Sequence, residues 1–133
     1  MKNNGRIICG FAGIGKSTLA KNKAGFVDLE STPFEKDWDR YVKVAIHMSS
    51  NGYTVLMSCH AELREKLHDK NARYLLAIPS KDKKEEYIQR YKNRKNTEDF
   101  IRLLSDNWNS FLSVLPHEKD ILIVTDYLEN ENL

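Results

Sequence analysis

The sequence predicts an α/β domain in which a parallel sheet of five strands is covered by helices on both faces. Short apolar segments alternate with longer amphipathic or charged segments from one end of the chain to the other. Consecutive parallel strands need right-handed crossovers, and these crossovers place helices against the sheet. The chain has 133 residues, of which 41% are hydrophobic and 30% are charged, as is typical of one globular domain. We therefore expect a single domain over residues 1–133.

The first half of the chain contains three expected strands and two helices. Residues 6–9 form a short apolar run that ends at a glycine, which is typical of a buried strand. Residues 16–24 have helix-forming composition and stop at a glycine, and residues 26–29 form a second strand before Ser-Thr-Pro. From about residue 35 to residue 50, apolar side chains recur at helical spacing until Asn-Gly closes the helix. Residues 53–58 form the clearest strand, with β-branched and aromatic residues at its start and an apolar middle.

The second half of the chain continues the alternation. Residues 61 to about 70 favour a short charged helix, and residues 73–78 favour a strand that ends at a proline. A serine precedes the helix expected over residues 81–92, where it is a candidate cap. A second capped helix is expected from Thr97, with inward-facing apolar residues as far as Leu115. Residues 121–125 form the last strand.

Charge and composition exclude several classes of protein. The 21 basic and 19 acidic residues leave a net charge of +2, which argues against a general nucleic-acid or membrane binder. No apolar run approaches the roughly 20 residues that cross a bilayer. The N-terminus is unlike a secretory signal, and Cys9 and Cys59 are too few for a disulfide framework. We therefore expect reduced thiols in a cytoplasmic protein.

One motif carries chemistry, and it lies between the first expected strand and the first helix. The pattern G-x-x-x-x-G-K-[ST] is satisfied by Gly10, Phe11, Ala12, Gly13, Ile14, Gly15, Lys16 and Ser17, and Thr18 follows. Glycines let a loop turn its N–H groups inward around phosphate oxygens, and the start of the next helix adds partial positive charge. Lys16 can reach the outer phosphates, and the Ser17 hydroxyl is placed to ligate Mg²⁺. The motif predicts binding of ATP with Mg²⁺, and its strand–loop–helix context disfavours a chance glycine-rich turn.

Other protein classes with this loop need residues that the chain does not have in the right places. A GTPase needs N-K-x-D for guanine, and the N-K-A-G of residues 22–25 lacks the aspartate. A motor or RecA-like ATPase places an acid at the end of an inner apolar strand, where residues 56–60 read L-M-S-C-H. Asp126 follows the last strand instead, where it either ends a buried edge strand or touches the nucleotide base.

The loop motif and the alternating layout resemble the nucleoside monophosphate kinase-like family, which includes nucleotide, shikimate and gluconate kinases. The resemblance covers the whole chain in layout and is specific at residues 10–18. It implies a three-layer P-loop NTPase fold with a short helical lid, here at approximately residues 80–97. It also implies an acid that faces the acceptor or the waters of Mg²⁺ at the end of the second strand, where Asp28 and Glu30 stand. A solvated turn is the alternative for these two carboxylates.

The lid of this family carries paired arginines, and the chain has Arg90 and Arg94 in R-x-x-x-R. The i, i+4 spacing places both guanidinium groups on one face of a helix. Converging arginines stabilise the negative charge on a transferred phosphoryl group, and a closed lid excludes water. We expect Lys16, Arg90, Arg94 and Asp28 to act in catalysis, and the alternative for the arginines is a basic, solvated helix.

Ligands of parallel sheets bind beyond the carboxyl ends of the strands, so His60 and Arg64 are expected near the acceptor. Nucleotide kinases grip the acceptor's phosphate with an arginine shortly after this strand, which Arg64 resembles loosely because D-G-x-P-R is absent. His60 either hydrogen-bonds a base or phosphate or caps the helix. Arg40 belongs to the second helix, where acceptor contacts also gather, or is a solvated residue. The expected acceptor residues are therefore Asp28, Glu30, Arg40, His60 and Arg64.

These observations predict an ATP-dependent phosphotransferase that moves the γ-phosphoryl group of Mg-ATP to a small molecule. A (deoxy)nucleoside monophosphate is the favoured acceptor, because at least two arginines approach its pocket. The alternatives are a nucleoside, a sugar-type hydroxyl or a polynucleotide end, or a regulatory protein that binds ATP without transferring its phosphate. The sequence leaves the oligomeric state open.

Overall fold

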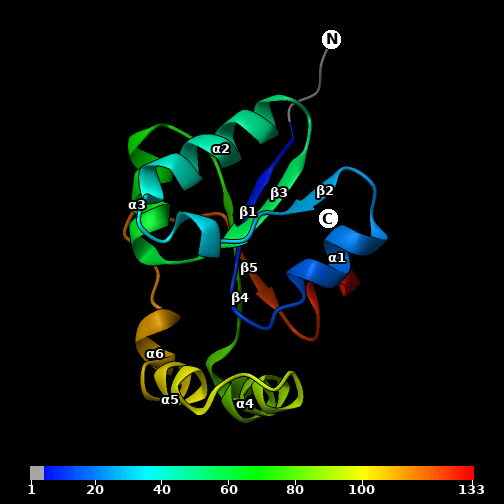
Figure 1. Cartoon of the computed structure of the whole chain (residues 1–133), viewed down its shortest axis with the longest axis vertical. Helices are drawn as coiled ribbons and strands as arrows, with labels where there is room; N and C mark the ends of the chain where they lie inside the picture. Colours follow the sequence, from blue (N-terminus) through cyan, green and yellow to red (C-terminus); the bar gives the residue numbers. More distant parts are fainter. Residues whose placement is uncertain (1–4) are drawn as a thin grey trace.

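Five parallel strands form one sheet at the centre of the molecule (Figure 1). The computed structural model describes residues 5–133. The strands are β1 (Ile7–Gly10), β2 (Phe26–Asp28), β3 (Thr54–Ser58), β4 (Leu75–Pro79) and β5 (Ile121–Val124). They lie in the order β2-β3-β1-β4-β5, and every neighbouring pair is parallel. The expected α/β class and its five strands are confirmed, with strand ends that differ from the prediction by at most two residues.

Strand β1 lies in the middle of the sheet because it has no polar face. All four of its residues are buried. Ile7 is in register with Val55 of β3 on one side, and Ile8 is in register with Leu75 of β4 on the other. A strand of this kind is most stable between two neighbours and beneath helices on both faces. The segment that follows β1 therefore leaves the sheet at the middle of its carboxyl edge.

Helices cover both faces of the sheet. The connection from β1 to β2 passes β3 in one direction, and the next two connections run in the opposite direction. Right-handed crossovers therefore place α1 (Lys16–Asn22) on one face, and α2 (Trp38–Ser50) and α3 (Ala61–Asp69) on the other. Helix α2 packs against α3, and α1 packs beside the C-terminal turn η3 (Leu128–Asn130), which gives three layers. Within residues 5–133, no helix combines the length and the apolar composition that a bilayer crossing requires.

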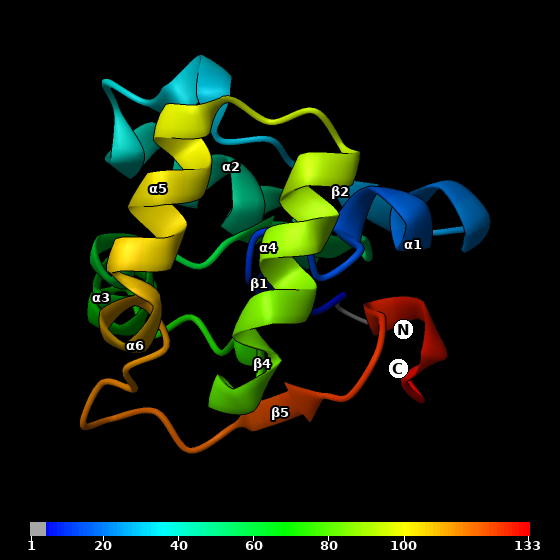
Figure 2. The same cartoon turned by 90° about the horizontal axis from the view of Figure 1, so that it is seen from below.

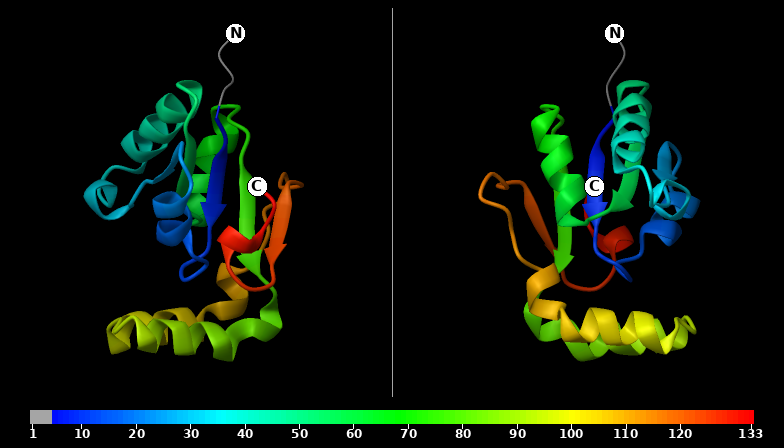
Figure 3. Two further views of the ribbon diagram at one scale, coloured as in Figure 1. Left: turned by 90° about the vertical axis from the view of Figure 1, so that its right-hand side faces the viewer. Right: turned by 60° about the vertical axis from the view of Figure 1, so that its left-hand side comes forward.

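A further group of helices crosses the carboxyl end of the sheet. It contains η2 (Lys81–Lys83), α4 (Lys84–Asn93), α5 (Glu98–Asp106) and α6 (Trp108–Phe111), and we call residues 81–111 the helical layer. Figure 2 shows α4 and α5 side by side, and Figure 3 shows both lying across the strand direction. The prediction of a short lid at residues 80–97 is therefore corrected. The helical layer extends to residue 111, and its buried side chains, which include Tyr87, Tyr91 and Trp108, fasten it to the rest of the protein.

The single helix expected from Thr97 to Leu115 is interrupted at Asn107. Its backbone leaves helical geometry (φ −111°, ψ 17°), and its side-chain amide donates to the carbonyl of Leu103 (2.9 Å). The next residue, Trp108, is buried and donates its indole N–H to the carbonyl of Lys81 (2.9 Å). The chain changes direction here because this tertiary contact outweighs the local preference for one long helix.

The capping predictions have mixed outcomes. The Thr97 hydroxyl accepts a hydrogen bond from the amide of Phe100 (3.2 Å), as expected for a cap. The Ser80 hydroxyl donates to the Asp82 carboxylate and caps no helical amide. The helix expected from about residue 35 begins at Trp38, after the short turn η1 (Thr32–Phe34), because Pro33 and the turn occupy the earlier residues.

Candidate functional site

The glycine-rich loop, residues 10–15, joins β1 to α1 at the middle of the sheet's carboxyl edge. Gly13 and Gly15 have φ angles of +86° and +102°. This left-handed backbone is unfavourable for residues with a Cβ atom. A Cβ atom at Gly13 would also lie 2.9 Å from the ring of Tyr91. Glycine at this position is therefore required by the backbone conformation and by the packing of α4.

Several backbone amides of the loop are free to bind a ligand. The amide of Phe11 donates to the carbonyl of Ala77 (3.0 Å), and the amide of Ile14 donates to the carbonyl of Phe11 (3.1 Å). Within residues 5–133, the amides of Gly13, Gly15, Lys16 and Ser17 donate no hydrogen bond. Free N–H groups gathered in one turn form a concave site for an anion.

The Lys16 ammonium group lies over its own loop. It donates to the carbonyl oxygens of Gly10 (2.7 Å) and Phe11 (3.4 Å). Burial lowers the pKa of Lys16; the Asp28 carboxylate opposes this shift, and the Arg94 guanidinium adds to it. Two carbonyl dipoles stabilise a half-buried cation only weakly. The positive charge of Lys16 would therefore attract an anion bound at the loop, because its hydrogen-bond partners are two neutral carbonyl groups.

Strand β2 brings Asp28 to the first turn of α1. The Ser17 hydroxyl donates to Oδ2 of Asp28 (2.7 Å), so the residues expected at the metal and at the acceptor lie together. Hydroxyl and carboxylate oxygens are ligands that Mg²⁺ prefers, and Mg²⁺ usually takes few protein ligands and keeps several waters. The Ser17–Asp28 pair fits this pattern. In the described part of the chain, no three His, Cys, Asp or Glu side chains are grouped to enclose a metal ion.

Arg90 is held inside the protein, contrary to the expectation that it faces the transferred phosphoryl group from a lid. Its side chain is 8% exposed. One terminal nitrogen donates to the carbonyl of Gly13 (2.9 Å), and the other donates to the carbonyl of Asp126 (2.7 Å). The guanidinium carbon lies 4.2 Å from the ring centre of Tyr87 and 3.9 Å from that of Tyr127. Arg90 therefore fastens α4 to the loop and to the C-terminal segment, because its donors are directed to backbone carbonyls.

Arg94 and Asp126 border the loop in different ways. Arg94 is exposed at the C-terminal end of α4, and its charge lies close enough to Lys16 to lower the pKa of that ammonium. Asp126 follows β5, and its carboxylate accepts a hydrogen bond from Asn130 (3.0 Å). Of the two arginines expected to act together, only Arg94 is exposed to solvent, whereas Arg90 is buried.

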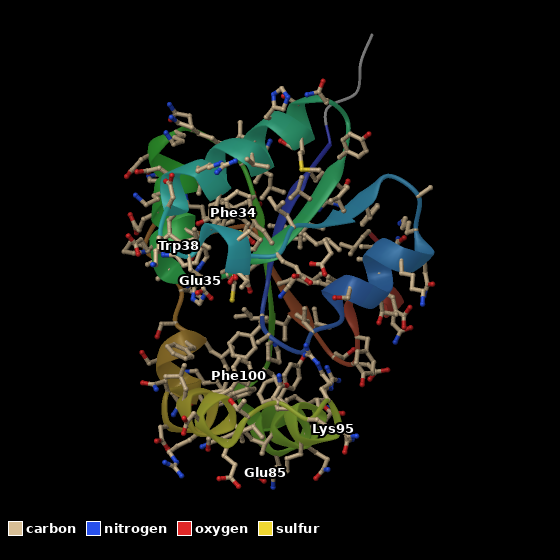
Figure 4. All side chains as sticks on the ribbon, in the orientation of Figure 1. Phe34, Glu35, Trp38, Glu85, Lys95 and Phe100 are labelled. Atoms are coloured by element: carbon tan, nitrogen blue, oxygen red, sulfur yellow. The ribbon has the colours of Figure 1, made fainter. Side chains whose placement is uncertain are left out.

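Three predicted acceptor residues are exposed in the segments that follow β2 and β3: Glu30, Arg40 and His60. The Arg40 guanidinium lies 5.8 Å from the ring centre of Phe34, and the imidazole of His60 lies 5.7 Å from the ring of Trp38. Partial burial, together with the charge of Lys16, lowers the pKa of His60 and favours its neutral form. Figure 4 shows Phe34 and Trp38 in the part of the molecule that contains the sheet. It shows Phe100 on the side of the helical layer that faces the sheet.

The prediction that Arg64 holds the acceptor is wrong, because Arg64 is a buried structural residue. It is 3% exposed and forms an ion pair with Glu118. Its Nε donates to the carbonyl of Cys59 (2.9 Å), and a terminal nitrogen donates to the carbonyl of Ser113 (3.4 Å). The Glu118 carboxylate also accepts from the Tyr74 hydroxyl (2.6 Å). Arg64 therefore joins α3 to the segment before β5 through these contacts.

Three tyrosines that the sequence does not predict to be in the site surround the loop: Tyr87, Tyr91 and Tyr127. Two of them had a detectable signal, because Tyr87, Arg90 and Tyr91 are spaced i, i+3 and i+4 in a basic stretch. This spacing places the three side chains on one face of α4, and it indicates that this face is buried although most residues of the helix are charged or polar. Tyr127 had no local signal, since only the return of the C-terminal segment brings it to Gly15.

Replacement of Asp28 by asparagine is expected to weaken Mg²⁺-dependent nucleotide binding about 10- to 100-fold. Asparagine retains an oxygen that can accept from Ser17, but it lacks the negative charge that a divalent cation requires. The measurement is the thermal shift produced by ATP with and without Mg²⁺, which needs no catalytic turnover. Asp106→Asn, at an exposed position on α5, is the control. An undiminished Mg²⁺ effect in the Asp28 variant would contradict this assignment.

Comparison with known proteins identifies relatives of the fold only. No protein-family profile matches the chain, and no curated protein sequence matches it. The crystal structure of APE1195 is similar over 91% of this chain and 86% of that chain, with a TM-score of 0.53 and 16% identity. A tunicamycin resistance protein of Deinococcus radiodurans is similar over 90% of this chain and 86% of that chain, with a TM-score of 0.55 and 11% identity. At these identities the similarity supports the class of the fold, an α/β domain with a parallel five-stranded sheet. It gives no evidence about function.

Proposed function

We propose that the protein is an ATP-dependent phosphotransferase of the P-loop type. The observation that carries the proposal is the loop between β1 and α1. There, the pattern G-x-x-x-x-G-K-[ST] coincides with free amides, the Lys16 ammonium and the Ser17–Asp28 pair. These groups suit an anion that carries Mg²⁺. A nucleoside triphosphate has the charge and the length to contact all of them.

The topology of the sheet supports the same position for the ligand. Ligands of parallel α/β sheets bind at the carboxyl edge, where connections from adjacent strands run in opposite directions. The connection that leaves β1 runs toward β2, and the one that leaves the adjacent strand β4 runs toward β5 on the other side. The glycine-rich loop leaves the sheet at this point.

Each group has a proposed role in the transfer. An acceptor oxygen forms a bond to the γ-phosphorus of ATP, the bond to the bridging oxygen breaks, and ADP leaves with the electron pair. Lys16 and Arg94 stabilise the negative charge on the transferred group. Ser17 and Asp28 hold Mg²⁺, which neutralises phosphate charge when it is bound. Where the acceptor is a hydroxyl, Asp28 orients it, and its proton passes to solvent.

A nucleoside monophosphate is the acceptor that the exposed side chains support best. Arg40 and Arg94 are two cations available to the acceptor's phosphate. The rings of Trp38 and His60 supply aromatic surface for a flat base. A sugar-type hydroxyl is a weaker candidate, because a sugar has no flat base for the aromatic surface. A nucleic-acid end offers the same phosphate and base and is the alternative acceptor.

One observation favours a second function, a regulatory protein that binds ATP without transferring its phosphate. Arg90 and Arg64, both expected to face the substrates, are committed to internal contacts. Fewer cations are therefore left to stabilise a transferred phosphoryl group than in the arrangement that the sequence predicts. Nucleotide binding at the loop is common to both functions.

The test is a coupled assay of ADP release with Mg-ATP and each common ribo- and deoxyribonucleoside monophosphate in turn. We expect ADP to rise above background with at least one acceptor, and the diphosphate product to appear in equal amount. Thermal unfolding with Mg-ATP is measured in parallel to report binding. ATP binding without ADP from any of these acceptors would exclude transfer to a nucleoside monophosphate and favour the regulatory function. Absence of ATP binding would exclude both.

A further inference from the structure

Helix α4 contacts the glycine-rich loop through two consecutive residues. The Tyr91 hydroxyl donates to the carbonyl of Ala12 (2.8 Å), and the Arg90 guanidinium donates to the carbonyl of Gly13 (2.9 Å). Two successive carbonyl groups of the loop are therefore directed toward α4. Neither donor belongs to the motif, and both come from residues almost 80 positions further along the chain.

The direction of these carbonyls sets the direction of the amides that follow them. In a trans peptide the C=O and the N–H of the next residue lie in one plane and point in opposite directions. The amide of Gly13 therefore points away from α4, and it has no acceptor among residues 5–133. The next amide, that of Ile14, is occupied by the carbonyl of Phe11 (3.1 Å). Tyr91 consequently orients a free donor, whereas Arg90 supports the turn beside it.

We infer that Tyr91 is a positioning residue of the anion-binding loop, which it prepares by holding the carbonyl of Ala12 outward and the amide of Gly13 inward. This inference rests on the proposed binding of a triphosphate at the loop. An anion binds in a loop whose amides point into the concave side and whose carbonyl groups point away from it. A loop held in this arrangement before binding loses less conformational entropy when the ligand arrives.

The surroundings of Tyr91 suit this role. Its side chain is fully buried, and its ring packs edge-on against Phe100, with 5.3 Å between ring centres. Burial raises the pKa of Tyr91, so its hydroxyl remains a proton donor over the physiological pH range. Because the ring is held independently of the hydroxyl, Tyr91→Phe removes the hydrogen bond and keeps the packing.

The experiment compares Tyr91→Phe with Tyr74→Phe by calorimetric titration with Mg-ATP and with inorganic tripolyphosphate. Tyr74 also donates a hydrogen bond from a partly buried hydroxyl, to Glu118 at the opposite end of β4, and it is the matched control. We expect Tyr91→Phe to bind both ligands about five- to tenfold more weakly, the effect of roughly one hydrogen bond. Tyr74→Phe should retain wild-type affinity for both ligands even where its thermal stability falls.

Amide NMR supplies a readout that a merely structural role would not move. In the wild-type protein, tripolyphosphate should shift the Gly13 resonance and leave Gly25, a distant glycine of similar φ (+82°), in place. In Tyr91→Phe the Gly13 shift should be reduced. Equal affinities of the variant and the wild type would overturn the inference alone, and so would a wild-type Gly13 resonance that tripolyphosphate does not move, even if the variant fails to fold. A wild-type protein that binds neither ligand would overturn the proposed function and the inference with it.

Discussion

A Lys16→Ala variant is expected to lose phosphoryl transfer by several orders of magnitude while it folds as stably as the wild-type protein. Removal of one neutral donor from a site that stabilises developing negative charge already costs about 10²–10³-fold in rate. Lys16 carries a full charge directly after the loop, so its loss should cost more. In the described structure its ammonium group donates only to the carbonyls of Gly10 and Phe11. Burial already lowers the pKa of Lys16, so the charged form contributes little to folding.

The measurement is the rate of ADP release at saturating acceptor, together with the thermal unfolding midpoint of each variant. Lys21→Ala is the matched control, because Lys21 is an exposed lysine in the last turn of the same helix. It removes the same charge from α1 at a point remote from the loop, and its rate should stay near that of the wild type. An unchanged rate in Lys16→Ala would refute the site.

Replacement of Arg64 by alanine is expected to destabilise the fold by about 3–5 kcal/mol, the cost of leaving one partner of a buried ion pair uncompensated. The side chains of Arg64 and Glu118 are 4% and 1% exposed, so the carboxylate would be left without its cation and largely without water. Denaturant unfolding measures this loss. Lys66→Ala is the control, since the ion pair of Lys66 with Asp39 is exposed and its removal should have a much smaller effect.

The same variant separates the structural role of Arg64 from the role first expected of it. An arginine that grips the acceptor's phosphate would raise the KM for the acceptor when it is removed. We expect the KM to stay unchanged in Arg64→Ala at a temperature where the variant remains folded, because its donors are directed to Cys59, Ser113 and Glu118. A selective rise in acceptor KM would contradict the purely structural role of Arg64.

Glu118 also makes the fold sensitive to acid. Burial alone would raise its pKa, but hydrogen bonds from Tyr74, the amide of Leu115 and Arg64 outweigh burial and lower it below the ordinary value of 4.5. A carboxyl whose pKa is depressed by folding stabilises the protein above its unfolded pKa, and this contribution is lost as pH falls through the folded pKa. Unfolding free energies measured from neutral pH downward should therefore decline below about pH 5. Glu118→Gln should flatten this decline.

The order of the elements could be predicted because it depends on local patterns. Residues 53–58 are apolar and β-branched, and the helix around residues 38–50 shows apolar spacing, so both follow from a few adjacent positions. The break at Asn107 could not be predicted in the same way. It depends on Trp108 reaching the carbonyl of Lys81, a contact between residues 27 positions apart.

In the candidate site, too, local features could be predicted from the sequence and long-range contacts could not. Residues 10–18 could be assigned from a contiguous motif, since its glycines, lysine and serine lie next to one another in the chain. The sequence could not show which arginines are exposed and which are buried. An arginine in a solvated helix and an arginine that donates to backbone carbonyls have the same local sequence pattern. Arg94 is exposed, whereas Arg90 and Arg64 are buried against partners 36 to 77 positions away. Which cations reach a ligand is decided by how these distant segments pack.

The amino-acid sequence by itself determined the succession of strands and helices, and it located the glycine-rich loop between the first of each. These features follow from side-chain periodicity and backbone preference over a few residues. Only the tertiary structure decided that Asp28 meets Ser17, that Tyr91 and Arg90 hold the loop's carbonyls, and that Arg64 is paired with Glu118. Each of these contacts joins segments far apart in the chain, so its partner is set by the path of the backbone and the packing of the core.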